Sequence, residues 1–316
     1  MKSAHIKAIV AAVAATFALS GAGAALAQDS APKATPVSAA EAPNAKIRLT
    51  RVTPAYWKVT FNAPPLNIVG PVEVRELARI VSQIEADPYV KVVVFDSSVP
   101  DNFIAHYDLL RPLEESTGMA PGPTGMHPVP DLMVRIARLP LVTISSIRGR
   151  ATGIGSELIL ATDMRFASRE KAVISQFEVS AGFAPGGGPM SRLPRLIGRG
   201  RAMEVLLASD DIDGELAERY GYVNRALPDA ELDGFVDKMA RRIASFDKQA
   251  IADTKKLIDV ASLPPDAEMQ PNWDTFIKSV QRPGAQKRLG ALVKQGLQSD
   301  GAAEKNLAER TAAFKE

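Results

Sequence analysis

The chain contains no cysteine and only three histidines, His5, His106 and His127. The absence of cysteine excludes disulfide bonds and catalysis by a thiolate. The histidines form no cluster with acidic residues along the sequence, so a metal centre has few candidate ligands. We therefore expect neither a metal ion nor a cofactor.

A strong charge imbalance is also missing. Lys and Arg number 38 against 36 Asp and Glu, so the formal net charge is +2 at pH 7. Such a small basic excess does not indicate nucleic-acid binding. With 46% hydrophobic and 23% charged residues, the 316-residue chain has the composition of a soluble globular protein with one large core or two modest ones.

The first 27 residues have the pattern of a secretory signal peptide. Lys2 and Lys7 precede an Ala-rich apolar run at 8–25, and the tripeptide Ala-Leu-Ala at 25–27 fits the A-x-A cleavage pattern. An uncleaved anchor is less favoured, because the run is weakly hydrophobic for a spanning helix. A mis-assigned start is the other alternative. We predict cleavage after Ala27, a periplasmic or secreted protein, and no stable membrane insertion after cleavage.

The rest of the chain divides by composition into three parts. Residues 28–44 are rich in Ala, Pro and Ser and predict a flexible leader. A folded core is expected over 45–262, followed by a C-terminal helical region over 263–316 that carries two apolar stripes.

The start of the core indicates an α/β fold. Strands are predicted over 47–52 and 56–61, a helix over 71–86, and a strand buried on both faces over 90–95. A strand–helix–strand order of this kind favours a right-handed crossover within one sheet.

The most informative stretch runs over 139–188. It combines a buried strand (141–147), a glycine-rich turn (149–155) that leads into a helix near Ile154, and a second strand (163–167). A strand, glycine turn and helix in succession direct backbone N–H groups and the positive end of a helix dipole at a ligand.

Two carboxylates flank the glycine-rich turns of this stretch. Glu157 follows the first turn, and Glu178 precedes the second, at 186–188. Taken singly, they are an ordinary helix carboxylate and an ordinary loop acid. A carboxylate one turn into that helix places an acid/base group beside the anion site, which is typical of an enzyme that stabilises a developing oxyanion while it moves a proton.

The order of these landmarks resembles that of the crotonase superfamily, the enoyl-CoA hydratases and isomerases. That family shows a P-V-I-A-A-V-x-G strand and turn, then G-G-G-x-E-L-x-x-x-C-D, then Q-P-E-x-x-x-G. The corresponding residues here are Pro140 to Ser146, Gly149, Gly153-Ile154-Gly155-Ser156-Glu157-Leu158, Asp163, and Gln176 to Gly182. The resemblance extends over about 51–256. It implies an α/β fold with a crotonase-like, ββα-type spiral core and a C-terminal helical region.

The resemblance also implies site residues. The N–H groups of Ala105 and Ile154 correspond to the family's oxyanion hole, Glu157 to the group that orients and deprotonates water, and Glu178 to the group that delivers a proton to the α-carbon. The implied reaction is reversible hydration of a 2-enoyl thioester, with a CoA thioester as substrate rather than cofactor. The substrate-binding residues implied by position are Pro65, Asn67, Phe103, His106, Tyr107, Asp108, Gly153 and Gly155.

Two substitutions depart from the family pattern. His106 replaces a glycine, and it is either a new polar contact or a tolerated turn residue. Ile154 replaces the middle glycine; its N–H survives, but isoleucine adopts positive φ only at a cost and narrows the space for a thioester. The Gly- and Pro-rich segment 116–130 is expected to be irregular, and Met119, Met126 and His127 either shape specificity there or lie on an exposed loop. Tyr107 reaches the acyl pocket or packs against the leader.

Alternatives to a hydratase remain open. An isomerase would use a single carboxylate, and a non-catalytic exported protein would use the same pocket to bind an acyl or aromatic acid. Export stands against the hydratase interpretation, since CoA esters are cytosolic metabolites. By resemblance, the C-terminal helices build a homotrimer or hexamer.

Overall fold

The computed structural model describes residues 45–299 and 302–314. The predicted signal peptide (1–27) and leader (28–44) lie outside the described residues. None of the helices in the described part is long and apolar enough to span a membrane.

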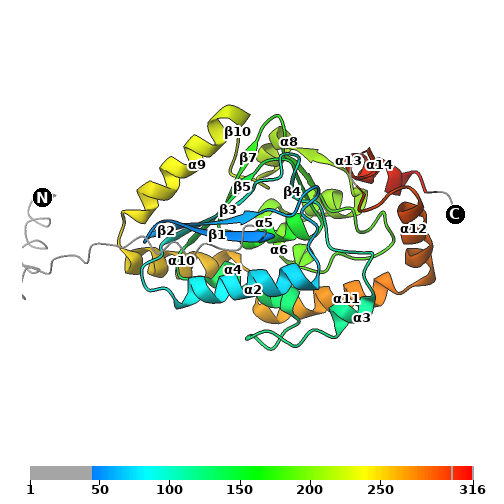
Figure 1. Ribbon diagram of the computed structural model, residues 1–316, viewed down its shortest axis with the longest axis horizontal. Coiled ribbons are helices and arrows are strands. Elements are labelled where there is room, and N and C mark those ends of the chain that lie inside the picture. The colour runs from blue at the N-terminus through cyan, green and yellow to red at the C-terminus, as the bar shows by residue number, and fades with distance from the viewer. Residues whose placement is uncertain (1–44, 300–301, 315–316) are drawn as a thin grey trace, which may run out of the picture. The chain divides into compact units, whose positions relative to one another are not determined.

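A six-stranded sheet forms the centre of the fold (Figure 1). Its order is β1-β2-β3-β5-β7-β10, and only the β1–β2 pair is antiparallel. The strands are β1 (Ile47–Thr53), β2 (Tyr56–Phe61), β3 (Val92–Ser97), β5 (Val142–Ile147), β7 (Met164–Ser168) and β10 (Arg225–Leu227). The mixed α/β fold predicted from the sequence is confirmed.

A second, smaller sheet runs beside the first. It contains β4 (Asn102–Ile104), β6 (Arg150–Thr152), β8 (Val173–Ser175) and β9 (Ile212–Asp213), in that order. The chain passes from β3 to β4, from β5 to β6 and from β7 to β8, so each of these three strands of the long sheet is followed by a short strand of the second sheet. These strands of two or three residues were not predicted, because they are too short to show a period of two.

The long sheet is covered on both faces, which explains the uninterrupted apolar character of β3. Val92 and Val94 of β3 pack with Leu232 and Val236 of α9 (Asp229–Ala244). The alternate side chains of β3 belong to the other core, which includes helices α2 (Pro71–Ala86) and α4 (Pro128–Arg138). Figure 1 shows α9 on one side of the strands and α2 and α4 on the other.

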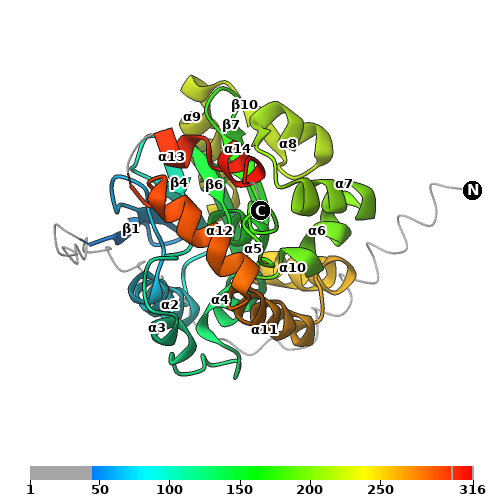
Figure 2. The same ribbon diagram turned by 90° about the vertical axis from the view of Figure 1, so that its right-hand side faces the viewer.

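The remaining helices surround this framework. They are α3 (Leu113–Thr117), α5 (Ile154–Ala161), α6 (Pro189–Ile197), α7 (Arg199–Met203), the π-helix η1 (Glu204–Ala208), α8 (Gly214–Tyr220), α10 (Lys248–Ser262), the 3₁₀-helix η2 (Asp266–Glu268), α11 (Met269–Val280), α12 (Pro283–Lys294), α13 (Ala302–Lys305) and α14 (Leu307–Ala312). Figure 2 shows α12 crossing in front of α5 and β6, with α13 and α14 beside it.

The segment 116–130 is less irregular than predicted. Helix α3 ends at Thr117, and α4 begins at Pro128, so only the part between them lacks a helix or strand. Pro128 is the first residue of α4, where proline lacks only an N–H that has no helical partner in any case. The prolines of this segment therefore mark a helix start as well as a loop.

The outer face of the sheet depends on α9. Leu232 is fully buried, so we expect Leu232→Ala to lower the free energy of unfolding by about 2–4 kcal/mol. Leu207→Ala is the control, because that side chain is 54% exposed and its loss should cost less than about 0.5 kcal/mol. Urea unfolding followed by circular dichroism measures the unfolding free energy of both variants. Equal losses of unfolding free energy in the two variants would contradict the burial pattern.

Candidate active site

Helix α5 begins at the glycine-rich turn, and Gly153 makes its start possible. Gly153 takes a positive φ of 54° and donates its N–H to Ser175 O at 3.0 Å. Ile154 follows as the first residue of α5 with an ordinary negative φ, so the predicted backbone strain at Ile154 does not arise. The Ile154 N–H is one of the first amides of α5, which have no carbonyl acceptor within the helix.

The two predicted glycines at this turn allow close packing. A Cβ added to Gly153 would lie 2.7 Å from Glu178 Oε1, and one added to Gly155 would lie 2.5 Å from Ile104 O. The structure thus places Gly153 against a carboxylate and Gly155 against the backbone of β4. Both positions exclude a larger side chain.

Glu157 lies in the first turn of α5 and is 4% exposed. Its Oε1 accepts a hydrogen bond from Gly187 N–H at 2.7 Å. Burial raises the pKa of Glu157 from 4.5 to about 7, while the N–H groups of Gly187 and Gly186 act in the opposite direction. The carboxyl therefore changes protonation near neutral pH, and its charged form has backbone donors.

Glu178 comes from the loop after β8 and is 6% exposed. Its Oε2 is buried and has no hydrogen-bond partner within residues 45–299 and 302–314. Burial, and then the negative charge of Glu157, raise the pKa of Glu178 well above its usual value. The environments of the two acids differ: Glu178 favours its neutral form, whereas the charged form of Glu157 has backbone donors.

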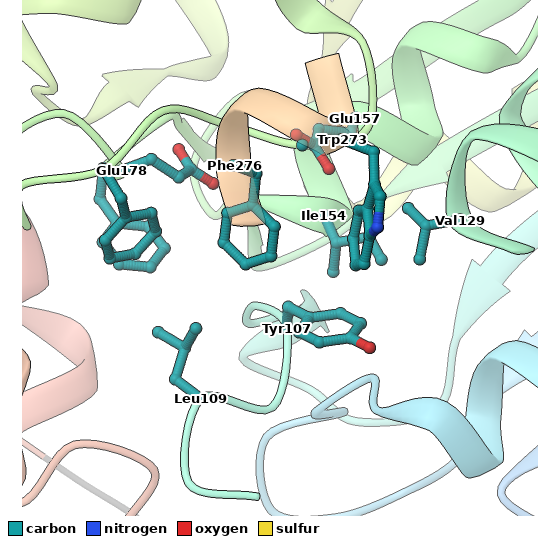
Figure 3. A pocket seen from close by; sticks show the side chains of 11 residues that line it. Tyr107, Leu109, Val129, Ile154, Glu157, Glu178, Trp273 and Phe276 are labelled. Carbon is teal, nitrogen blue, oxygen red and sulfur yellow. The ribbon is translucent and has the colours of Figure 1, made fainter. Parts of the chain in front are cut away.

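Both carboxylates line one small cavity of about 20 Å³ (Figure 3). That volume holds about one water molecule. In the close-up, Glu157 and Glu178 lie along one side, and Tyr107 and Leu109 lie across from them. The remaining lining residues are Val129, Ile154, Phe177, Phe183, Gly186, Trp273 and Phe276. The pair of acids is thus surrounded mainly by aromatic and aliphatic side chains.

The amide of Ala105, the predicted oxyanion donor, has an acceptor within the protein. Its N–H already donates to Leu66 O at 3.1 Å. Val69 N–H donates to His106 O and Asp108 N–H donates to Val69 O, which fixes the chain on either side of Tyr107. The Tyr107 N–H has no acceptor in the described part of the chain. The Tyr107 amide is therefore free, and Tyr107 and Ile154 both line the cavity.

The predicted residues Asn67 and Phe103 lie behind the cavity. Asn67 Nδ2 donates to Ser97 Oγ, Asn102 O and Phe103 O at 2.8–3.1 Å, and its Oδ1 accepts from Ala63 N–H. Phe103 is fully buried. Both residues support the loop that carries Tyr107, and neither lines the cavity.

Pro65 and Asp108 are also absent from the cavity lining. Pro65 is exposed, and Asp108 accepts hydrogen bonds from Arg111 and from Gln298 Nε2, the latter at 2.8 Å. Of the residues predicted to contact substrate, the structure therefore brings Tyr107 to the carboxylates and Gly153 against Glu178.

Comparison with known proteins agrees with this geometry. The profile of a family described as enoyl-CoA hydratase/isomerase matches residues 53–280, which is more than half of the chain. The chain belongs to the enoyl-CoA hydratase/isomerase family. It is 34% identical over 184 residues to the mitochondrial enoyl-CoA hydratase domain-containing protein 2 of Mus musculus, covering 58% of this chain and 61% of that protein.

Two further members are similar over longer spans. A short-chain-enoyl-CoA hydratase from Clostridium acetobutylicum is 30% identical over 204 residues, which are 64% of this chain and 76% of that hydratase. A crystal structure from Streptomyces avermitilis, provisionally assigned as an enoyl-CoA hydratase, has 42% identity and a TM-score of 0.81 over 86% of this chain and 98% of that one. The chain spans 61–63% of the length of the mitochondrial relatives.

Within the enoyl-CoA hydratase/isomerase family, His106 is the departure that the structure explains. Its Nδ1 lies 2.7 Å from Tyr107 O and its Nε2 lies 3.1 Å from Glu304 Oε2, with both side chains buried. His106 does not have a positive φ, so the polar-contact alternative is the correct one. Burial alone would raise the pKa of Glu304, but the hydrogen bond and charge of His106 lower it below its usual value.

Sequence reasoning missed most of the cavity wall. Trp273 and Phe276 of α11 were seen only as an apolar stripe, yet both line the cavity, and their rings lie 5.1 Å apart. His127 stacks on Trp273 at 3.9 Å between ring centroids, and its Nε2 lies 2.8 Å from Ser116 O. The Tyr107 hydroxyl bonds Ser116 Oγ at 2.8 Å. The spacing of Trp273 and Phe276 predicted that one face of the helix is buried, but it did not predict that this face packs against Tyr107 at the cavity.

The raised pKa of Glu157 gives the protein a pH-dependent stability. Between about pH 4.5 and 7 the folded state binds this proton more tightly than the unfolded state, so the contribution is present at low pH and is lost as the pH rises through 7. From pH 5 to 8 the parent should lose about 1–3 kcal/mol more unfolding free energy than Glu157→Gln. Urea titrations at several pH values measure this difference. Glu218 is exposed, so the unfolding free energy of Glu218→Gln should depend on pH as that of the parent does. If the unfolding free energy of Glu157→Gln fell with pH as steeply as that of the parent, the raised pKa would not belong to Glu157.

Proposed function

We propose that the protein catalyses reversible hydration of a 2-enoyl thioester. The observation that carries the proposal is the pair of buried carboxylates with unequal partners in one cavity. Glu157 has backbone donors that stabilise its charged form, whereas Glu178 is enclosed without a partner at Oε2 and is kept neutral. One base and one acid side by side are what the addition of water across a double bond requires.

The thioester carbonyl is held by two backbone amides. Its oxygen accepts hydrogen bonds from the N–H groups of Tyr107 and Ile154, and the latter is at the positive end of α5. As charge moves onto this oxygen, the two donors and the helix dipole stabilise the enolate. No side chain takes part in this step, so the replacement of glycine by isoleucine at 154 leaves the donor in place.

The two carboxyl groups then divide the proton transfers. Glu157 removes a proton from water while the water oxygen forms a bond to the β-carbon and the double-bond electrons move into the enolate. The Glu178 carboxyl transfers its proton to the α-carbon as the carbonyl re-forms. Glu157 ends protonated and Glu178 ends charged, and exchange with water after product release restores the starting state.

The small cavity favours a short acyl group. A volume of about 20 Å³ has no room for an acyl group while Trp273, Phe276 and Tyr107 hold their positions, so these side chains must move when a substrate binds. A four-carbon crotonyl group requires a smaller movement than a long chain does.

Hydration of crotonyl-CoA by the purified protein tests the two-carboxylate mechanism. With the parent protein, the loss of enoyl-thioester absorbance should be rapid for crotonyl-CoA and slower for 2-decenoyl-CoA. Glu157→Gln and Glu178→Gln should each reduce kcat by roughly 10²–10⁴-fold, since each removes one proton-transfer group. The parental rate should rise with pH through about 7 as Glu157 loses its proton. Glu218→Gln is the matched control and should retain the parental rate.

Other outcomes separate the alternatives. Migration of a 3-enoyl double bond that needs only one of the two acids would identify an isomerase. Tight binding of an acyl or aromatic acid with no turnover, unaltered in both glutamine variants, would identify a binding protein. Either result would overturn the hydratase proposal.

We also propose that the mature protein begins at Gln28 and is exported. Its support is the basic start, the Ala-rich run and the Ala-Leu-Ala tripeptide at 25–27. Full-length protein expressed in a Gram-negative host should be found in the periplasmic fraction with Gln28 as its first residue by mass spectrometry. Ala25→Lys should block cleavage. A cytosolic product that keeps Met1 would overturn the proposal.

We infer an oligomer of three or six chains. The α10 side chains Leu257 and Val260 are 73% and 78% exposed, which is unusual for two apolar residues on one helix and fits a subunit interface. Sedimentation velocity of the mature chain decides the assembly, and a monomer at micromolar concentration would exclude it.

A further inference from the structure

The loop that carries the free Tyr107 amide is supported from two sides. On one side, Val69 donates to His106 O at 3.1 Å and accepts from Asp108 N–H at 3.0 Å. On the other side lies the C-terminal part of the chain, with α13 beside β4, the strand that leads into this loop (Figure 2). The hydration mechanism proposed above gives the C-terminal contacts no role.

Two C-terminal residues contact this loop through their side chains. Glu304 Oε2 lies 3.1 Å from His106 Nε2. Gln298 Oε1 accepts from Leu109 N–H at 2.6 Å, and Gln298 Nε2 donates to Asp108 Oδ1 at 2.8 Å. Gln298 N–H also donates to Glu304 Oε1, which joins the two C-terminal side chains. The C-terminal contacts therefore reach both ends of the loop.

The partners of His106 determine which of its ring nitrogens carry protons. Nδ1 lies 2.7 Å from Tyr107 O, and a carbonyl oxygen can only accept, so Nδ1 donates. Burial by itself raises the pKa of Glu304, but the hydrogen bond and charge of His106 leave it below its usual value. Glu304 is therefore a carboxylate, which also accepts, and Nε2 donates as well. His106 is thus an imidazolium paired with a carboxylate.

This ion pair is enclosed and its acidic member is held in place. The His106 and Glu304 side chains are 1% and 4% exposed, so loss of either partner would leave a buried charge without a counter-ion. Arg150 Nη1 of β6 donates to Lys305 O at 3.2 Å, which ties α13 to the short sheet. The pair therefore connects the loop to a fixed part of the structure.

We propose that His106 and Glu304 are positioning residues of the oxyanion hole, and that they hold the Tyr107 N–H at the thioester carbonyl oxygen. The hydrogen bond from Val69 N–H to His106 O fixes the peptide group before Tyr107, and the His106 ring fixes the carbonyl after it. The inference rests on the proposed function. A glycine at 106, as in the family pattern, has no side chain to make this contact.

The rate of crotonyl-CoA hydration is the first measurement. Glu304→Ala should lower kcat and kcat/KM together by roughly 10–100-fold, because a displaced amide stabilises the developing oxyanion less well. Glu304→Gln keeps an oxygen that accepts from Nε2 and should retain more activity than Glu304→Ala. Glu309→Ala is the matched control: it removes an exposed acid from α14 and should change the rate less than about twofold.

The carbonyl stretching frequency of bound butyryl-CoA is the second measurement, and it needs no turnover because this thioester is saturated. Hydrogen bonds to the carbonyl oxygen should lower the frequency when the parent or Glu309→Ala binds butyryl-CoA, and should lower it less in Glu304→Ala. If Glu304→Ala does not fold, as judged by circular dichroism, Glu304→Gln replaces it in both measurements.

The two measurements separate this inference from the proposed function. A parent that hydrates no enoyl thioester, but shows the spectral difference from Glu304→Ala, would refute the hydratase proposal and leave the positioning role supported. A carbonyl frequency in Glu304→Ala equal to that of the parent would overturn the positioning role, as would a crotonyl-CoA rate equal to that of Glu309→Ala in an active enzyme.

Discussion

The site depends on burying two carboxyl groups together where water has almost no access. Such a pair cannot hold two negative charges, and which acid keeps its proton is decided by backbone donors. Gly187 N–H stabilises the charge on Glu157, and the enclosed Oε2 of Glu178 has no equivalent. The rest of the site serves this arrangement. Gly153 and Gly187 lack the Cβ that would displace a carboxylate, and the α11 aromatics keep solvent out.

Local patterns in the sequence predicted local features well. The helix over 71–86 has the observed bounds of α2, because a regular apolar face and a proline at its first position define it. The two glutamates were found because each adjoins a glycine-rich turn. Ala105 was named from its position in the family pattern; the hydrogen bond that its amide donates to Leu66 O joins two distant segments, and no short-range pattern reports it. The contacts of Trp273 and Phe276 were likewise hidden, since they join α11 to a loop far back in the chain.

The contact between His106 and Glu304 has a consequence for biosynthesis. The two residues are 198 positions apart. His106 leaves the ribosome long before Glu304, so its Nε2 lacks this partner while nearly two hundred further residues are added. Until α13 arrives, the loop that presents the Tyr107 amide lacks one of its supports. The framework of strands can form during translation, but the competent arrangement of that loop is a late event of chain synthesis.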